Sequence, residues 1–586
     1  MKEILESRLL KLARKVQRWE SRLRLLSWLR ILSFSSIVSG AFLLYSFQID
    51  FGISIFLLLF LISIFYIFVF LYSRCESFKA RLEFKRRFLE REIARCEGNT
   101  RKLFRSSPVD EETLRSHPYA RDLNVFEKEG IFSLIDTTST DSGERLFLQN
   151  LLQENSSNQN SIHSNQALVK NFSTRKWFSY KFLRIASEDW DFFLGKKWSL
   201  SAWTNTENRF YEKRSFLRKV YPFYSPIGCF LILGSILFQT PFGVASFLLH
   251  LILFLSYRRE SIQEFRKWES AWNRLRQVRL LLRLCMKFGG STLREDLGFI
   301  ETSFQKFSRS WSGLWRSPVP HFLTNVLYLH DLWILSRMKK WQGDFQEHTL
   351  EWIEFLERID SLHPMIHLRF IFTNVSFPKI DASLNYICGK NVRHPLIPKD
   401  RCVPNPIEQI EMGKILLITG SNMSGKTTYM RTIGVNVLLG MMGGPVLAES
   451  MEFPPMKILC SVRNEDSLTE GISLFYAEVK RLSEIFRSIR KGDFIYLVLL
   501  DEILKGTNTR ERYLATKEVL NQLNGQRAFT FCTTHDLDLA KLPGLILKHF
   551  TETIEGDSMN FDYKIREGIV ESTNALFILK KEGVIS

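Results

Sequence analysis

The stretch Gly413-Lys-Ile-Leu-Leu-Ile-Thr-Gly-Ser-Asn-Met-Ser-Gly-Lys-Thr-Thr-Tyr-Met-Arg431 decides the fold of the carboxyl-terminal part of this 586-residue chain. Residues 415–418 are apolar, as in a buried strand. The spacing Gly420-x-x-x-x-Gly425-Lys426-Thr427 fits a phosphate-binding loop that leads into a helix. Glycines let such a loop turn its backbone amides towards phosphate oxygens. The sequence therefore predicts a nucleotide-binding domain of the α/β P-loop class.

Two acidic residues follow a second apolar strand. Residues 496–500, Tyr-Leu-Val-Leu-Leu, run into Asp501 and Glu502. We expect Asp501 and the Thr427 hydroxyl to hold Mg²⁺, while Glu502 orients and deprotonates the attacking water and Lys426 reaches the outer phosphates. The spacing of 75 residues between Lys426 and Asp501 favours this interpretation over that of an ordinary strand end.

A third strand, residues 529–533, leads to His535, which we expect to sense the terminal phosphate. The catalytic candidates are thus Glu502, Lys426 and His535. The predicted cofactors are ATP and Mg²⁺. The residues expected to contact the nucleotide are Gly420, Ser421, Asn422, Met423, Ser424, Gly425, Lys426, Thr427 and Thr428.

Composition excludes disorder and argues against a structural metal centre. Apolar residues make up 45% of the chain, enough for a sizeable core in two to four domains. The eight cysteines are scattered and include no CxxC pair, so we expect reduced thiols and no structural zinc.

The net charge of +18 is concentrated in three windows. Residues 1–30 contain nine basic and three acidic side chains, residues 74–105 eleven and five, and residues 258–294 ten and three. Residues 401–586 are nearly balanced, with 22 basic and 23 acidic side chains. All three windows border the most hydrophobic segments, so the charge is first a signal of membrane topology and second a signal of DNA binding.

Two helical hairpins are predicted to cross a membrane. Residues 31–47 and 51–72 contain no Asp, Glu, Lys or Arg, and residues 222–238 and 242–257 repeat the arrangement. For the second pair, a buried hairpin in a soluble core is the alternative. Basic residues flank both pairs, which predicts a multi-pass protein of the inner or cytoplasmic membrane with residues 1–30, 73–221 and 258–586, including the ATPase domain, in the cytoplasm.

The amino-terminal segment, residues 1–30, carries a heptad stripe of Leu, Val and Trp surrounded by Lys and Arg. Such a helix could lie on anionic lipids, pair with another helix or pack on its own protein. Between the hairpins, the Asn- and Ser-rich run of residues 153–165 predicts a solvated loop. Apolar residues recur at helical spacing over residues 258–287, which predicts an all-α core with long helices ahead of the ATPase.

The motifs together resemble the MutS family of DNA mismatch-repair ATPases. The similar stretches, in the family's order, are Arg393-His-Pro395, residues 419–431, Val446-Leu-Ala-Glu-Ser450, Leu500-Asp-Glu-Ile503, Lys505-Gly-Thr-Asn-Thr509 and Thr534-His535. Residues 132–143 are similar to the opening of the family's helical core. The likeness covers roughly residues 115–575 and is strongest over 390–540.

The resemblance implies a dimer in which each signature loop closes over the partner's nucleotide. The matching stretch is residues 466–475, in which Gly471 and Ser473 fit, whereas Thr469, Glu470 and Ile472 depart from the family's pattern. An aromatic residue that stacks on adenine is expected near residues 401–405, where Cys402 stands instead. The basic stretch and first hairpin replace the mismatch-reading module that the family places ahead of its core.

The leading hypothesis is a membrane-anchored MutS-like ATPase in which dimer closure drives a helical domain that binds DNA without reading mismatches. Its expected partners are ATP, a second copy of the chain, DNA and anionic membrane lipids. The alternatives are an ABC-type transporter half and a regulatory membrane scaffold. The expected segments are a basic helix (1–30), a hairpin (31–72), a helical segment with the start of the core (73–221), a second hairpin (222–257), long core helices (258–385) and the ATPase (386–586).

Overall fold

A computed structural model describes most of the chain and divides it into two compact units. The described residues are 2–47, 50–103, 108–154, 158–175, 177–186, 215–238, 242–289, 302, 305, 318–372, 374–421, 423–462, 474–555 and 558–569. The first unit comprises residues 1–136, 371–437 and 446–586, and the second comprises residues 137–370 and 438–445. The first unit therefore joins the amino-terminal hairpin to the ATPase region, which the expected domain boundaries had kept apart.

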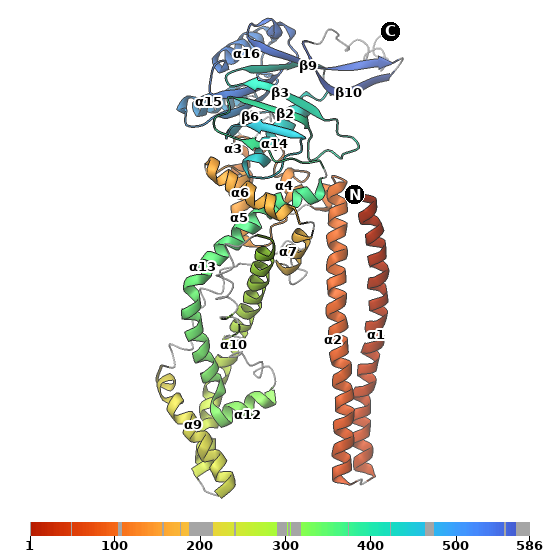
Figure 1. Ribbon diagram of the computed structural model, residues 1–586, viewed down its shortest axis with the longest axis vertical. Helices are drawn as coiled ribbons and strands as arrows, with labels where there is room; N and C mark the ends of the chain where they lie inside the picture. Colours follow the sequence, from red (N-terminus) through yellow and green to blue (C-terminus); the bar gives the residue numbers. More distant parts are fainter. Residues whose placement is uncertain are drawn as a thin grey trace. The chain divides into compact units, whose positions relative to one another are not determined.

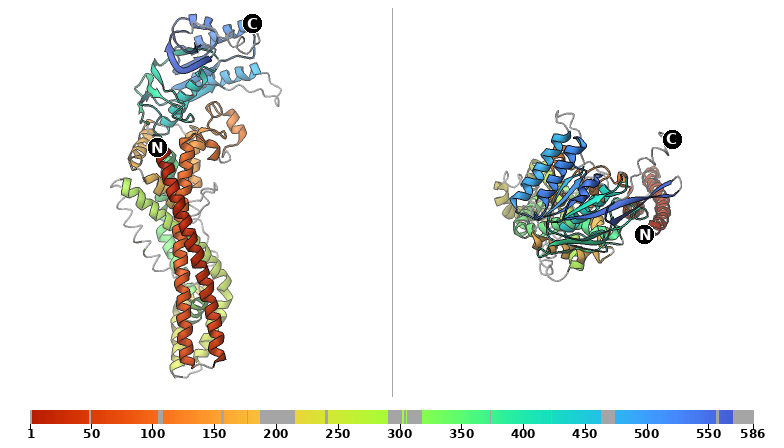
Figure 2. Two further views of the ribbon diagram at one scale, coloured as in Figure 1. Left: turned by 90° about the vertical axis from the view of Figure 1, so that its right-hand side faces the viewer. Right: turned by 90° about the horizontal axis from the view of Figure 1, so that it is seen from above.

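The amino-terminal hairpin of the first unit consists of two long helices, α1 (Lys2–Ser46) and α2 (Phe51–Cys96), which run side by side (Figures 1 and 2). The helix that carries the heptad stripe of residues 1–30 continues into the apolar run without a break. Leu5, Leu12 and Val16 of this stripe are buried. Further along, the rings of Trp19 and Phe78 lie 4.6 Å apart. In the structure, residues 1–30 therefore pair with a helix of the same protein, as two of the three roles require, and the role on anionic lipids stays a prediction.

The carboxyl end of α2 is anchored in the body of the first unit. Arg95 is buried, pairs with Glu92 and donates hydrogen bonds to the carbonyl oxygens of Leu134 (3.0 Å) and Asp136 (3.1 Å). After the helix, Gly98 has φ +65°, and an added Cβ would lie 3.3 Å from both the Leu396 oxygen and Pro398 Cγ. The glycine thus ends the helix and permits a close approach to the loop at residues 396–398.

The ATPase region is built on a six-stranded sheet. Its order is β10 (Ser558–Glu567), β9 (Leu545–Glu555), β4 (Ile415–Thr419), β8 (Ala528–Thr533), β7 (Tyr496–Asp501) and β6 (Lys457–Ser461). All neighbouring pairs are parallel except β9 and β10, whose antiparallel ribbon extends at one edge in Figure 1. A second sheet has the order β1 (Lys379–Ile380), β5 (Ser450–Phe453), β2 (Tyr386–Val392) and β3 (Asn405–Glu411).

Helices cover both faces of the six-stranded sheet because its central strands are apolar on both sides. On one face, α15 (Leu474–Lys491) and α16 (Thr509–Leu523) pack against alternate residues of β4, β7 and β8. On the other, α14 (Lys426–Met441) places Gly434 so close that an added Cβ would lie 2.9 Å from Leu499 and 2.8 Å from Leu123. Residues 118–123, near the short helices η1 (Thr100–Lys102), α3 (Glu111–Ser116) and α4 (Ile131–Ile135), thus belong to the ATPase unit.

The second unit is helical in its described residues. It contains α5 (Asp141–Leu151), α6 (Gln159–Ser173), α7 (Phe178–Ala186), α9 (Ser215–Phe238), α10 (Phe242–Gly289), α12 (Pro318–Tyr328) and α13 (His330–Ile371), as Figure 1 shows. The prediction of a loop over residues 153–165 was wrong from Gln159 onward, where the structure has a helix. There α6 buries Ile162, Gln166, Val169 and Phe172 at helical spacing, so packing overrides the polar composition.

A buried polar cluster holds the start of the second unit against α13. The Asp360 carboxylate accepts hydrogen bonds from the backbone N–H and hydroxyl groups of Ser139 and Thr140, at 2.7 to 3.0 Å. One turn further, His363 lies 2.8 Å from the Thr137 hydroxyl and 2.9 Å from the Ser179 hydroxyl. Burial raises the pKa of the Asp360 carboxyl, and its hydroxyl and amide donors only partly oppose that rise.

Three helices in the described part of the chain are long and apolar enough to cross a membrane: the segments Glu3–Ser46, Gly52–Cys96 and Phe242–Glu269. They include both arms of the first predicted hairpin and the second arm of the other. The arm in α9 contains Pro222 and Pro226 and is not among the three.

Candidate nucleotide-binding site

The phosphate loop lies between β4 and α14, as the sequence predicts. Gly420 has φ +142° and Gly425 has φ +108°, and an added Cβ at Gly420 would lie 2.6 Å from the Phe550 carbonyl oxygen. Both positions therefore require glycine, and the loop can present its backbone amides to phosphate. Met423 also has a positive φ, of 69°, and its side chain is 86% exposed. Asn422 lies outside the described residues.

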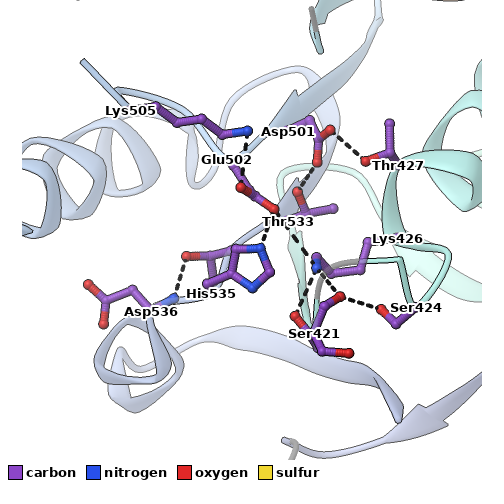
Figure 3. A network of polar contacts seen from close by, with 12 residues as sticks. Ser421, Ser424, Lys426, Thr427, Asp501, Glu502, Lys505, Thr533, His535 and Asp536 are labelled. Carbon is purple, nitrogen blue, oxygen red and sulfur yellow. Dashed lines mark hydrogen bonds and ion pairs between the residues drawn. The ribbon is translucent and has the colours of Figure 1, made fainter. Parts of the chain in front are cut away.

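Lys426, the first residue of α14, turns its ammonium group into the loop. Its Nζ donates to the carbonyl oxygens of Gly420 and Ser421, both at 2.8 Å, and lies 3.8 Å from Glu502 Oε1 (Figure 3). Burial lowers the pKa of this lysine, although Glu502 and Asp501 act in the opposite direction. Only 4% of the side chain is exposed, and Lys426 lines the cavity beside the loop.

The hydroxyl and carboxylate predicted to hold Mg²⁺ come together. Thr427 Oγ1 donates to Asp501 Oδ2 at 2.7 Å, and the Thr533 hydroxyl donates to the other Asp501 oxygen (Figure 3). Within the described residues there is no group of three or more His, Cys, Asp or Glu side chains that could hold a metal ion. One carboxylate and one hydroxyl fit Mg²⁺, which keeps several waters and takes its other ligands from phosphate.

Glu502 lies among basic side chains. His535 Nε2 lies 2.5 Å from Oε1, and Lys505 Nζ lies 3.0 Å from Oε2 (Figure 3). Burial alone would raise the pKa of Glu502, but His535 and Lys505 outweigh it and lower the pKa to about 2. Glu502 also has φ +47°, a strained conformation that directs the side chain from the end of β7 towards the phosphate loop. The carboxylate is therefore ionised and oriented at neutral pH.

A cavity of about 730 Å³ opens beside the phosphate loop. Of the predicted residues, it is lined by Ser421, Met423, Ser424, Gly425, Lys426, Thr427, Thr428 and Glu502. The loop at residues 394–403 forms another wall, which includes Cys402. Burial lowers the pKa of His394 in this wall to about 4, so the ring is neutral and contributes no charge.

One of the aromatic residues in the cavity wall comes from a distant strand, whereas the others, Tyr429 and Phe550, lie on α14 and β9. Tyr563, on β10, lines the cavity, and its ring is 3.3 Å from the position of a Cβ built on Gly425. The Asn405 side chain donates to the Tyr563 carbonyl oxygen at 2.8 Å and accepts from the Ile565 N–H at 2.9 Å. The expectation of an aromatic near residues 401–405 therefore identified the region that holds Tyr563 but not the residue itself. No periodicity or motif marks Tyr563 in the sequence.

The residues expected to act in trans, Gly471 and Ser473, lie outside the described residues. Their role in a partner's site stays a prediction.

The parallel strand order and the side chains at the ends of β4, β7 and β8 define a P-loop nucleotide-binding domain. Comparison with known proteins identifies its family. Residues 416–584 match the family model of MutS domain V. Over 217 residues the chain is 35% identical to the DNA mismatch repair protein MutS of Natronomonas pharaonis, an alignment that covers 35% of this chain and 24% of the relative.

Other relatives point to the same family. The endonuclease MutS2 of Thermotoga neapolitana is 32% identical over 200 residues, or 33% of this chain and 26% of the relative. The DNA mismatch repair protein MSH3 of Candida glabrata is 27% identical over 283 residues, or 43% and 27% respectively. The chain thus spans about a quarter of the length of these relatives. Residues 416–584 are therefore a nucleotide-binding domain of the MutS family.

Proposed function

We propose that the protein is a Mg²⁺-dependent ATP hydrolase anchored in a membrane. The observation that carries the proposal is the convergence of Lys426, Thr427, Asp501, Glu502 and His535 at the carboxyl ends of parallel strands. Bound Mg²⁺ would spread the charge that develops on the transferred phosphoryl group. Lys426 binds phosphate oxygens, Thr427 and Asp501 hold the ion, and Glu502 orients and deprotonates a water.

The test is phosphate release by the purified full-length chain with ATP, with and without Mg²⁺. We expect Mg²⁺-dependent release and its loss in Lys426→Met, because the ammonium group in the loop is gone. Lys414→Met is a matched control, since Lys414 is exposed at the start of the same strand. Absence of Mg²⁺-dependent release from the wild type, or full activity in Lys426→Met, would overturn the proposal.

Membrane anchoring is supported by the surface of the first hairpin. Phe42, Phe56, Tyr66 and Phe70 are each more than 60% exposed, although they belong to the apolar runs of α1 and α2. Such a continuous apolar surface favours a lipid environment over water. We place the protein in the inner or cytoplasmic membrane with its ATPase on the cytoplasmic side, where the basic flanks face anionic lipid headgroups.

Alkaline extraction of membranes checks this placement. The chain should stay in the pellet with integral proteins, and protease added to the cytoplasmic side should cleave the ATPase region. Release into the supernatant would contradict membrane insertion.

A basic surface of the second unit supports nucleic acid as the partner of the helices. The basic patch comprises Arg175, Lys181, Arg184, Arg283 and Lys287, all exposed on or beside α7 and α10, which pack together. Arg175 and Lys181 each lie 5.9 Å from the ring centre of Phe288, and Trp177 beside them is 49% exposed. Residues 155–187 and 270–294 contain no Asp or Glu. Cations interleaved with aromatic rings are typical of backbone binding to nucleic acid.

Distance along α10 favours DNA over lipid for this patch. Arg283 and Lys287 follow Tyr257, the end of the apolar run, by 26 and 30 residues, or roughly 39 and 45 Å of helix. That length exceeds the roughly 8 Å Debye length at physiological salt. We therefore propose that the patch contacts the phosphates of duplex DNA without reading bases.

A salt series of duplex DNA binding tests this part of the function. Lys181→Gln should lower the slope of log affinity against log salt by about one unit, as expected when one phosphate contact is lost. Lys541→Gln, at a residue 79% exposed in the first unit, is the control. Binding to anionic vesicles and not to DNA would overturn the assignment and favour the scaffold or transporter alternative.

A further inference from the structure

The loop that follows Glu502 is held by the first turns of α15. Gly506 lies so close to the helix that an added Cβ would be 2.8 Å from the Phe475 nitrogen and 3.0 Å from its Cα. A side chain at Gly506 would therefore push the loop away from the helix. The backbone of the loop is strained, with φ +47° at Glu502 and +61° at Leu504. A strained loop of this kind keeps its conformation only when its surroundings fix it.

Glu478, one turn into α15, supplies that fixation. The side chain is buried, with 3% exposed. Burial raises the pKa of its carboxyl, and hydrogen bonds from the backbone N–H groups of Lys505 and Gly506 partly offset that rise. A buried carboxylate that accepts two backbone hydrogen bonds determines where those two residues lie.

The position of Lys505 in turn decides one of the contacts of Glu502. Lys505 Nζ lies 3.0 Å from Glu502 Oε2, on the opposite oxygen from His535. The basic groups that face Glu502 are therefore Lys505 from its own loop, His535 from the end of β8 and Lys426 from the phosphate loop. Without Lys505, the carboxylate would keep its contacts on Oε1 only.

We propose that Glu478 is a positioning residue for ATP hydrolysis: by fixing the backbone of residues 505 and 506, it sets Lys505 on Glu502 and so orients the carboxylate that receives a proton from the attacking water. The role rests on the proposed ATPase function. It assigns a task to a buried acidic side chain that is not among the residues lining the described cavity.

The test is a double-mutant cycle on the full-length protein, with Glu478→Ala, Lys505→Met and the combined variant. We expect each single change to lower kcat by about tenfold and to leave the ATP dissociation constant within about twofold, because phosphate binding is untouched. The combined variant should lose no more than either single variant, since both act through the same contact. Glu484→Ala is the matched control, as Glu484 lies on the same helix with 47% of its side chain exposed.

The split between kcat and the ATP dissociation constant separates positioning from a general packing effect, because a general loss of packing would weaken ATP binding as well. Additive losses in the cycle, or parallel losses of kcat and of ATP affinity, would overturn the proposal.

If Glu478→Ala does not fold, Glu478→Leu, which keeps more of the side-chain volume and has no hydrogen-bond acceptor, carries the same cycle. A wild type without ATPase activity would overturn the proposed function and this role together, whereas an active wild type with additive variants would overturn this role alone.

Discussion

Two carboxylates, Glu502 in the nucleotide site and Asp360 in the helical unit, are both shielded from water and held by several hydrogen-bonding partners, yet their pKa values move in opposite directions. Glu502 faces His535, Lys505 and Lys426, and its pKa is lowered to about 2. Asp360 faces the neutral hydroxyl and amide groups of two residues, and burial raises its pKa.

The difference lies in what each carboxylate can do. Glu502 lines a cavity and has cations around it, so its charge is stable and can be used on a ligand. Asp360 is closed off, and all its partners belong to residues that begin the helical unit. Partners that carry charge mark the functional site, whereas neutral donors mark a structural joint.

The largest effect is expected from Glu502→Gln. It should lower kcat by about 10³-fold, since a general base contributes factors of that order, while ATP still binds. The midpoint of thermal unfolding should change less in Glu502→Gln than in Asp360→Asn. Single-turnover phosphate release and nucleotide binding measure the two quantities. A Glu502→Gln variant with normal turnover would remove the distinction drawn between the two carboxylates.

Asp360→Asn should act on stability and not on chemistry. The amide nitrogen would face N–H and O–H donors that the carboxylate accepts, which costs about 3 kcal/mol of unfolding free energy. Chemical denaturation followed by circular dichroism measures the loss. Ser361→Ala, at a buried neighbour whose hydroxyl bonds only within its own helix turn among the described contacts, is the control and should cost less. Equal costs for both variants would contradict the role of Asp360 as a joint.

Tyr563→Ala sharpens the boundary of the nucleotide site. Loss of an aromatic ring from the cavity wall should weaken ATP binding by about fivefold to tenfold, or about 1 kcal/mol. Tyr563→Phe should bind normally, because the ring and not the hydroxyl makes the wall. A fluorescent nucleotide titration measures both. Unchanged affinity in Tyr563→Ala would place the base elsewhere.

The smallest effect is on the pH dependence of stability, and its sign differs between the two carboxylates. Folding lowers the pKa of Glu502. Its stabilising contribution to the free energy of unfolding is therefore full above the ordinary glutamate pKa and falls as the pH drops towards 2. The pKa of Asp360 is raised, so its contribution grows as pH falls through the folded value. Between pH 6 and 4, the free energy of unfolding of the wild type minus that of Glu502→Gln should decrease by less than about 1 kcal/mol. The same difference between the wild type and Asp360→Asn should increase. Changes of the same sign would contradict the two assignments.

Local chemistry was predictable from the sequence, and long-range partners were not. The glycine spacing and the acid pair predicted that Lys426 and Thr427 meet Asp501 and Glu502, because a phosphate loop and a strand end are each formed by neighbours in the chain. Tyr563 was missed because β10 reaches the cavity only through the sheet order, which no spacing encodes. Asp360 was missed because its partners lie about 220 residues earlier.

The long helix α2 has a mechanical consequence. It runs unbroken for 46 residues, so it is a stiff rod of about 69 Å whose root is clamped by Arg95. Gly98, two residues after the helix, lies so close to Pro398 that an added Cβ would be 3.3 Å from its Cγ. The Pro398 carbonyl oxygen accepts hydrogen bonds from the backbone of Arg401 and Cys402, which line the nucleotide cavity. One degree of rotation about the root displaces the far end by roughly 1.2 Å. Torque applied at the apolar end is therefore borne one loop away from the cavity wall that contains Arg401 and Cys402.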